Sequence, residues 1–404
     1  MNPDTAVPPA VRAAILATAT PRCAYVYDRA VLRAQARALR AALPPESLLL
    51  YAVKANGHPG VVDALADAVD GFEVASGGEL AIARAAARPD QAIVMGGPGK
   101  TEDELRAAVE AGATVNVESA LELRRLSTVA ERVGRPVRAT LRVNRRHVAL
   151  PGSHAMTGQP TPFGLDEESL GEVVALARDH PAVALVGFSL HAVSNNLDAA
   201  AHARFVADAV AWSVTAAQRY GVPLTVVNVG GGFGVSYTSA ERFDLATFAR
   251  ELGGLRLPPG ARLVVEPGRF LAAEAGWYAA EVLDLKRTHG RWFAVLRGGT
   301  HHFRLPAAWG YSHPFAVLPV DAWPHPYPRP EVHDVPVDAV GELCTPRDVL
   351  TRGQPVARLR VGDVLVFPRT GAYGWEISHH DFLHHDPPAF CVIDSAPDHR
   401  PGTR

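Results

Sequence analysis

Short, almost continuously apolar runs alternate with longer alanine-rich segments from about residue 28 to residue 270. Apolar runs bounded by polar residues predict buried strands, and the alanine-rich segments between them predict helices. Such an alternation is typical of a parallel sheet that helices cover on both faces. We therefore expect a closed (β/α)8 barrel over residues 28–270, with an open doubly wound sheet as the alternative. The predicted strands lie in SLLLYAV, GFEVA, QAIVM, TVNVE, RATLRVN, ALVGFSLHAV, LTVVNVGGG and RLVVEPG.

The pattern changes after residue 270, where helical periodicity largely disappears. Strand-like runs such as YAAEVLDLKR, WFAVLRGG and GDVLVFP are interrupted by the proline-rich stretch PVDAWPHPYPRPEVHDVPV. This region predicts a separate β domain over residues 271–404. The segment 1–27 contains one further strand-like run, RCAYVY, which we expect to join that domain.

Composition excludes several classes of partner. The 404 residues are 48% hydrophobic and 20% charged. The net charge is only -2, and positive and negative residues are interspersed along the chain. A protein that binds nucleic acid or an anionic membrane would need clustered lysine and arginine, so we expect neither partner. Three cysteines fit a reducing compartment, and the N-terminal segment has an acidic residue, Asp4, where a signal peptide would be positively charged. These features predict a cytoplasmic protein.

The run LLLYAVKANGHP places Lys54 within an apolar, strand-like stretch. A lysine in such a setting reaches solvent, finds a charged partner or loses its proton, and the last outcome makes it a nucleophile. An imine-forming lysine would need a carbonyl cofactor such as pyridoxal 5'-phosphate (PLP). That cofactor requires a phosphate cradle, a group stacked on its ring and a charge partner for its pyridine nitrogen.

Three other motifs are weaker than they look. GGPGKT at 96–101 has Val94 where a P-loop needs glycine, and GGGFG at 230–234 has Val235 where a dinucleotide motif needs glycine. HHDFLHH at 379–385 puts two histidines at i, i+4 but lacks the glutamate of a metalloprotease helix. We therefore expect neither nucleotide nor metal.

Seven motifs in order carry a resemblance that covers nearly the whole chain: YAVKANGHP, GFEVASGGEL, HAVSNN, VGGGFG, EPGRF, ELCTPRDVL and GAYG. Together they resemble the fold-type III PLP-dependent amino acid decarboxylases, which include the diaminopimelate, ornithine and arginine decarboxylases. The resemblance implies an alanine-racemase-like barrel with a C-terminal β domain. It also implies a homodimer whose active sites are shared between subunits.

Carried over to this sequence, the resemblance implies a role for each matching residue. Lys54 would hold PLP as an imine, His191 would stack on the PLP ring, and Glu266 would pair with the pyridine nitrogen. Cys344 would come from the other subunit and lie close to the reacting carbon. The phosphate would be held by Ser194, Gly231, Gly232, Gly268, Arg269 and Tyr373.

Chemical reasoning agrees with decarboxylation. A carboxylate such as Glu266 keeps the pyridine nitrogen protonated, so that the ring accepts the electron pair left when CO2 departs. The racemases that share the barrel implied by this resemblance have an arginine, and not a glutamate, at the position of Glu266. The product carbon then needs a proton, for which Cys344 is a candidate general acid.

The residue after Cys344 bears on the substrate. Relatives acting on ornithine have aspartate there and diaminopimelate decarboxylases have glutamate, whereas this chain has Thr345, which offers no charge to a distal ammonium. ELCTPRDVL and GAYGWEISHHDFL instead resemble the branch from carboxylate siderophore biosynthesis, which decarboxylates a citryl-diaminopropionate conjugate. Besides Thr345, the candidate substrate-binding residues are Arg304, Arg347, His379 and His380.

Alternative functions stay open at this point. They are diaminopimelate decarboxylase, another basic amino acid decarboxylase, a non-catalytic PLP-binding protein and a regulatory homologue that has lost catalysis.

Overall fold

A computed structural model describes residues 7–146, 148 and 150–395, so the ends of the predicted segments 1–27 and 271–404 lie outside the described residues. The chain divides into two compact units. The barrel unit contains residues 33–235 and 241–271. The β unit contains residues 1–32, 236–240 and 272–404. No change of composition in the sequence marks the short segment 236–240.

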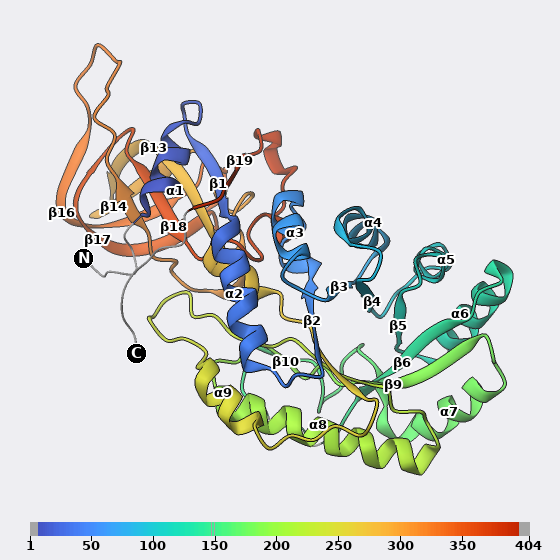
Figure 1. Ribbon diagram of the computed structural model, residues 1–404. Helices are drawn as coiled ribbons and strands as arrows, with labels where there is room; N and C mark the ends of the chain where they lie inside the picture. The colour runs from blue at the N-terminus through green and yellow to red at the C-terminus, as the bar shows by residue number, and fades with distance from the viewer. Residues whose placement is uncertain (1–6, 147, 149, 396–404) are drawn as a thin grey trace. The chain divides into compact units, whose positions relative to one another are not determined.

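The barrel unit has a closed ring of parallel strands (Figure 1). Each strand pairs in parallel with the next, and the pairings of β5 with β6 and of β12 with β2 close the ring. The predicted (β/α)8 barrel is therefore confirmed, and the open-sheet alternative is wrong. The strands are β2 Ser47–Ala52, β3 Gly71–Val74, β4 Ala92–Met95, β5 Thr114–Val117, β6 Val137–Asn144, β9 Val183–Ser189, β11 Val226–Gly230 and β12 Arg262–Val265.

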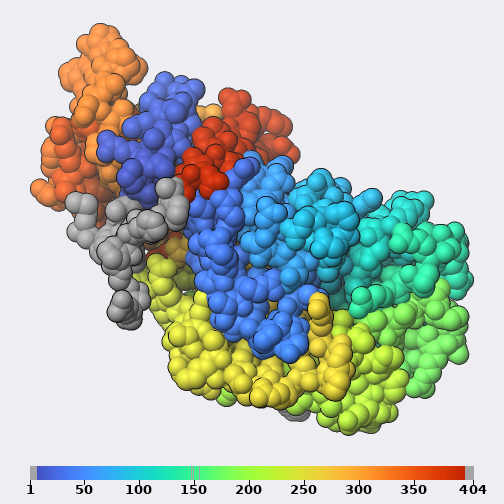
Figure 2. All heavy atoms as spheres, in the orientation of Figure 1, coloured from blue at the N-terminus to red at the C-terminus, as the bar shows by residue number. Residues whose placement is uncertain are grey.

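Helices connect these strands and form the outer surface of the barrel unit, which passes from blue through green to yellow in Figure 2. Several begin at side-chain caps, as where Thr101 and Glu104 form a capping box. The helices are α2 Arg29–Ala42, α3 Pro59–Ala66, α4 Gly77–Ala86, α5 Glu102–Ala111, α6 Ala120–Val133, α7 Leu170–Arg178, α8 Ala199–Tyr220, α9 Leu245–Leu252 and α10 Arg269–Ala272. The short elements are η2 Val53–Ala55, β7 His154–Ala155, β8 Leu165–Asp166, η3 Glu167–Ser169 and β10 Val193–Ser194.

Apolar side chains fill the barrel. One buried cluster joins Leu50 of β2, Val94 of β4 and Val226 of β11. Because β4 and β11 lie on opposite sides of the ring, this contact crosses the interior. The interior is a packed core, so chemistry is expected at the carboxyl ends of the strands.

The β unit is built around a mixed sheet that includes β1, as predicted from RCAYVY. β1 pairs antiparallel with β13 and parallel with β19. Helix α1 covers this sheet with Val11 and Ile15, which pack against Val26 and Val366. The elements are α1 Pro9–Leu16, β1 Cys23–Asp28, η4 Ala273–Ala275, β13 Gly276–Thr288, β14 Arg291–Leu296, α11 Leu305–Trp309, β15 Ala316–Leu318, β16 Glu331–Val340, β17 Val349–Arg360, β18 Val364–Pro368, η5 Trp375–Ile377, η6 Phe382–His384 and β19 Ala389–Ile393.

A helix that crosses a bilayer needs about 20 consecutive, predominantly apolar residues. Within the described residues, no helix is long and apolar enough to cross a membrane.

Candidate active site

Lys54 lies in the 3-10 turn η2, which directly follows strand β2. Its Nζ is 2.7 Å from Oε2 of Glu73, a nearly buried residue on the adjacent strand β3. The Lys54 side chain is 46% exposed, so the lysine both reaches solvent and has a charged partner. The sequence analysis gave no role to Glu73, although this residue lies in the motif GFEVASGGEL. The available signal was that its strand directly follows the strand of SLLLYAV in the predicted barrel, so that the two strands are neighbours.

Glu266 follows strand β12 and is buried. Its Oε1 accepts a hydrogen bond of 2.6 Å from Nδ2 of Asn228, a residue of β11 that the sequence did not single out. Burial, and then the negative charge of Glu73, raises the pKa of Glu266 to about 7. A buried carboxyl in this condition favours a cationic partner, which would stabilise its ionised form.

His191 follows strand β9. Its Nδ1 accepts a hydrogen bond of 3.3 Å from the backbone N–H of Gly231, so the ring proton is on Nε2 when the ring is neutral. Burial and the charge of Arg142 hold the pKa of His191 well below its ordinary value. The backbone comes close to this ring at Gly230, where φ is 69° and a Cβ would lie 2.3 Å from Nδ1. Only glycine fits there.

The loops after β9 and β11 pack against each other beside His191. The N–H of Asn196 donates to the carbonyl of Gly232 at 2.7 Å, and the N–H of Gly234 donates to the carbonyl of Asn196 at 2.8 Å. Ser194 ends the short strand β10 in the first of these loops. The structure therefore brings Ser194 near Gly231 and Gly232, as a phosphate cradle would require.

The loop after β12 approaches the turn that carries Lys54. A Cβ at Gly268 would lie 2.8 Å from the Cβ of Ala55, so this position has room only for glycine. Arg269 is buried and begins α10. Tyr373 belongs to the β unit, where it is half-buried with a φ of 54°.

A further ion pair lies at the carboxyl ends of β5 and β6. Nη1 of Arg142 is 2.9 Å from Oε1 of Glu118, whose Oε2 accepts a hydrogen bond of 2.9 Å from the N–H of Gly164. The guanidinium of Arg142 also lies over the ring of Phe163, at 4.8 Å. Sequence reasoning missed this pair, because neither residue stands in a motif.

Two of the three weaker motifs, GGPGKT and HHDFLHH, have structural roles. In GGPGKT, Lys100 is buried with its Nζ 2.6 Å from Oε1 of Glu122, and Thr101 caps α5. In HHDFLHH, Nε2 of His380 donates to the carbonyl of Trp375 at 2.6 Å, and the two rings stack. The described residues contain no group of three or more histidines, cysteines, aspartates or glutamates arranged to hold a metal ion.

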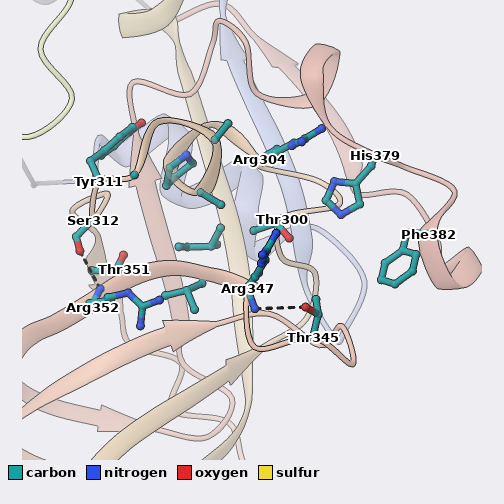
Figure 3. Close-up of a pocket in the computed structure, with 16 residues that line it drawn as sticks. Thr300, Arg304, Tyr311, Ser312, Thr345, Arg347, Thr351, Arg352, His379 and Phe382 are labelled. Carbon is teal, nitrogen blue, oxygen red and sulfur yellow. Dashed lines mark hydrogen bonds between the residues drawn. The ribbon is translucent and has the colours of Figure 1, made fainter.

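A cavity of about 820 Å³ in the β unit brings several candidate substrate-binding residues together (Figure 3). Its lining includes Thr345 and His379, whereas His380 is not part of it. Three arginines also line it: Arg304, Arg347 and Arg352, of which Arg352 was not predicted.

The cavity is cationic in character, because no aspartate or glutamate is among the described residues that line it. Arg304 and His379 lie next to one another in Figure 3. Burial and the charge of Arg304 lower the pKa of His379. Cys344 is exposed and precedes Thr345 in the chain. This surface suits an anion with several carboxylates.

The barrel residues fit the chemical demands of PLP. Lys54 offers a partly exposed amine, and the raised pKa of buried Glu266 fits a carboxyl meant for a pyridinium nitrogen. The loops carrying Ser194 and Gly232 lie against each other, since a Cβ at Gly232 would lie 2.8 Å from the carbonyl oxygen of Val193, and glycine at such a position lets backbone come close to a phosphate. When bound, PLP supplies an electron-withdrawing ring that stabilises negative charge on the substrate's α-carbon.

Comparison with known proteins gives a consistent picture. The family model "Pyridoxal-dependent decarboxylase, pyridoxal binding domain" matches residues 29–273. The chain is 39% identical to 2-[(L-alanin-3-ylcarbamoyl)methyl]-2-hydroxybutanedioate decarboxylase of Staphylococcus aureus, over 92% of this chain and 94% of that protein. It is 30% identical to a diaminopimelate decarboxylase of Aquifex aeolicus, over 88% and 83% of the two chains. The structure of diaminopimelate decarboxylase from Helicobacter pylori with L-lysine is similar, with a TM-score of 0.77, 27% identity and coverage of 90% and 89%.

Proposed function

Because the chain belongs to the pyridoxal-dependent decarboxylase family, we propose that it removes the α-carboxylate of an amino acid whose distal end carries carboxylates. The first candidate is the conjugate of citrate with 2,3-diaminopropionate, an intermediate of carboxylate siderophore biosynthesis. This proposal is carried by the cavity that three arginines line, with no aspartate or glutamate among the described residues around it. Diaminopimelate and other basic amino acids are the alternative substrates.

Charge complementarity supports the choice of substrate. A citryl conjugate presents two carboxylates and a hydroxyl at the end remote from the reacting carbon. Arg304 and Arg347 are suited to bidentate capture of carboxylates, and Thr345 and His379 offer neutral hydrogen bonds beside them. A substrate with a distal ammonium would instead face unpaired like charge, which is unfavourable.

The relative from Staphylococcus aureus adds independent support. The compound in its name is citrate joined through an amide to the 3-amine of 2,3-diaminopropionate. This relative matches almost the full length of both chains.

Each residue then has a role in the proposed reaction. Lys54 holds the cofactor, His191 stacks on it, and Glu266 pairs with its ring nitrogen. The phosphate is held by Ser194, Gly231, Gly232, Gly268, Arg269 and Tyr373. After CO2 departs, the thiol of Cys344 donates a proton to the α-carbon.

We also propose that the enzyme is a cytoplasmic homodimer with shared active sites, each taking Cys344 from the other subunit. All three cysteines are free, which supports a reducing compartment. Mixing inactive Lys54→Ala and Cys344→Ala subunits tests the sharing, since only a shared site would recover activity in the mixed dimer.

The substrate is tested by parallel assays of CO2 release from citryl-diaminopropionate, meso-diaminopimelate, ornithine and lysine. We expect turnover of the citryl conjugate, together with a cofactor absorbance band that the Lys54→Ala variant lacks. Turnover of meso-diaminopimelate alone would show that Thr345 does not discriminate as argued. A protein with no cofactor band would refute the assignment of Lys54.

The distal site is tested with Arg304→Ala, for which Arg358→Ala is the matched control. Arg358 is an exposed arginine of the same unit that pairs with Glu331 outside the cavity. Losing a charge-assisted contact should raise KM for the citryl conjugate about tenfold to hundredfold without changing the cofactor band. Equal kinetics in the two variants would refute a role for Arg304.

A further inference from the structure

A carboxylate is buried behind two of the loops that line the cavity. Asp348 is 2% exposed and directly follows Arg347. Its Oδ1 accepts a hydrogen bond of 2.6 Å from the N–H of Thr300, and its Oδ2 accepts one of 2.9 Å from the N–H of Leu343. One side chain therefore anchors two segments that are far apart in the sequence.

Both segments present residues of the proposed site. The first, loop 298–304, carries Thr300 and Arg304, and the second, loop 341–347, carries Cys344 and Thr345. The loops also join directly, because the N–H of Glu342 donates to the carbonyl of Gly298 at 3.0 Å. Asp348 thus accepts hydrogen bonds from the backbone of both loops, one carrying the candidate proton donor and the other carrying the candidate anion-binding arginine.

The backbone of each loop approaches the carboxylate too closely for a side chain. A Cβ at Gly299 would lie 2.5 Å from Oδ1 of Asp348, and a Cβ at Gly341 would lie 2.1 Å from Oδ2. The main chain of loop 341–347 is also bonded to that of Asp348, because the N–H of Gly341 donates to its carbonyl at 3.0 Å. Because both loops are hydrogen-bonded to the same carboxylate, neither can move away from it without losing a hydrogen bond.

We propose that Asp348 is a positioning residue that holds the Cys344 loop and the Arg304 loop at a fixed spacing. Recognition of the distal carboxylates and protonation of the α-carbon then act on one substrate molecule. This inference rests on the proposed function, which makes both loops face the substrate. Asp348 itself is buried and acts through the two loops.

The exchange of Asp348 for asparagine removes one anchor while almost preserving the shape of the side chain. A carboxylate accepts hydrogen bonds at both oxygens, whereas an amide accepts at one and donates at the other. In Asp348→Asn the amide NH2 would face the N–H of either Thr300 or Leu343, and that contact would be lost. A misplacement of about 1 Å in a catalytic group lowers rates by about a hundredfold.

The test compares kcat and KM per cofactor-loaded site in the Asp348→Asn holoenzyme with those of Asp363→Asn. Asp363 serves as the control, since it is a buried carboxylate of the same unit that accepts hydrogen bonds from the N–H groups of Val320 and Arg360 and, in addition, pairs with the side chains of Arg329 and Arg360. It does not line the cavity. We expect kcat/KM for the citryl conjugate to fall at least about tenfold in Asp348→Asn and to stay within about twofold in Asp363→Asn.

A second variant keeps the idea testable if Asp348→Asn does not fold. Asp348→Glu retains the charge and both acceptors but adds a methylene for which Gly299 and Gly341 leave no room. It too should lower kcat/KM, with an unchanged cofactor band. Kinetics near those of the wild type in either folded variant, or an equal loss in Asp363→Asn, would refute the positioning role.

Failure of the proposed substrate is distinguishable from failure of this inference. If the wild type decarboxylates meso-diaminopimelate and not the citryl conjugate, the substrate proposal is wrong. The same variants, assayed on meso-diaminopimelate, then decide the role of Asp348 through kcat.

Discussion

Replacing Glu266 by glutamine should stabilise the protein without cofactor and weaken the binding of PLP. The carboxyl is buried beside Glu73, and its pKa is raised from an ordinary 4.5 to about 7. A raised carboxyl pKa means that the folded state penalises the ionised form. The contribution of the neutral carboxyl to stability is therefore fully present below pH 4.5 and is lost as the pH rises to about 7.

The size of the effect on the free energy of unfolding follows from the difference between the ordinary and the raised pKa of Glu266. At about 1.4 kcal/mol for each pH unit between 4.5 and about 7, ionising Glu266 in the folded protein costs about 3 kcal/mol. Glutamine keeps the oxygen that accepts the hydrogen bond from Asn228 but carries no charge. Above about pH 7.5 the free energy of unfolding of Glu266→Gln should therefore exceed that of the wild type by up to about 3 kcal/mol.

Urea unfolding of the cofactor-free proteins between about pH 4 and pH 8.5 measures this difference. The gap between Glu266→Gln and wild type should open as the pH rises, and the exposed Glu110→Gln, which also removes one carboxylate, serves as the control for the change in net charge. With PLP present the order should reverse, because a pyridinium partner compensates the charge of Glu266. A gap that is constant with pH, or a glutamine variant that is less stable near pH 8, would refute this electrostatic account.

Three further predictions use other parts of the structure. Glu73→Gln should lower the pKa of Glu266, because the Glu73 charge helps to raise it, and the wild-type loss of stability should then occur at lower pH in the same urea experiment. Lys100→Met should cost about 3 to 5 kcal/mol of unfolding free energy by leaving Glu122 buried and unpaired, yet leave the cofactor absorbance unchanged; a loss of PLP binding would contradict the structural role assigned to GGPGKT. Thr345→Glu should raise kcat/KM for meso-diaminopimelate relative to the citryl conjugate by at least about tenfold, and an unchanged ratio would remove Thr345 as the discriminator.

The barrel was accessible from the sequence because its strands are apolar on both faces. A parallel strand buried in this way leaves a short continuous apolar run, as in SLLLYAV and RLVVEPG, and all eight predicted runs contain a strand of the ring. Lys54 and Glu266 stood out because each follows such a run. The roles predicted for the site residues stay predictions.

Other features depended on contacts that no local pattern encodes. In the sequence Asn228 is a single polar residue in an apolar strand, and its role depends on its hydrogen bond to Glu266, which lies just after the next strand of the ring. His379 and His380 are neighbours in the chain, but only His379 lines the cavity while His380 stacks on Trp375. Arg352 joins Arg347 in the cavity although the buried Asp348 and Leu350 lie between them in the chain.

Strand β1 is synthesised before the barrel strands, but its partners are synthesised after them. It pairs with β13, which begins at Gly276, and with β19, which ends at Ile393. The barrel unit, by contrast, has all of its strands once residue 271 has left the ribosome. During translation the barrel can therefore close while β1 still presents an apolar strand with open edges, which is the form most prone to pairing with other chains. The time between the synthesis of β1 and that of β19 is thus the interval in which a nascent molecule is most exposed to aggregation.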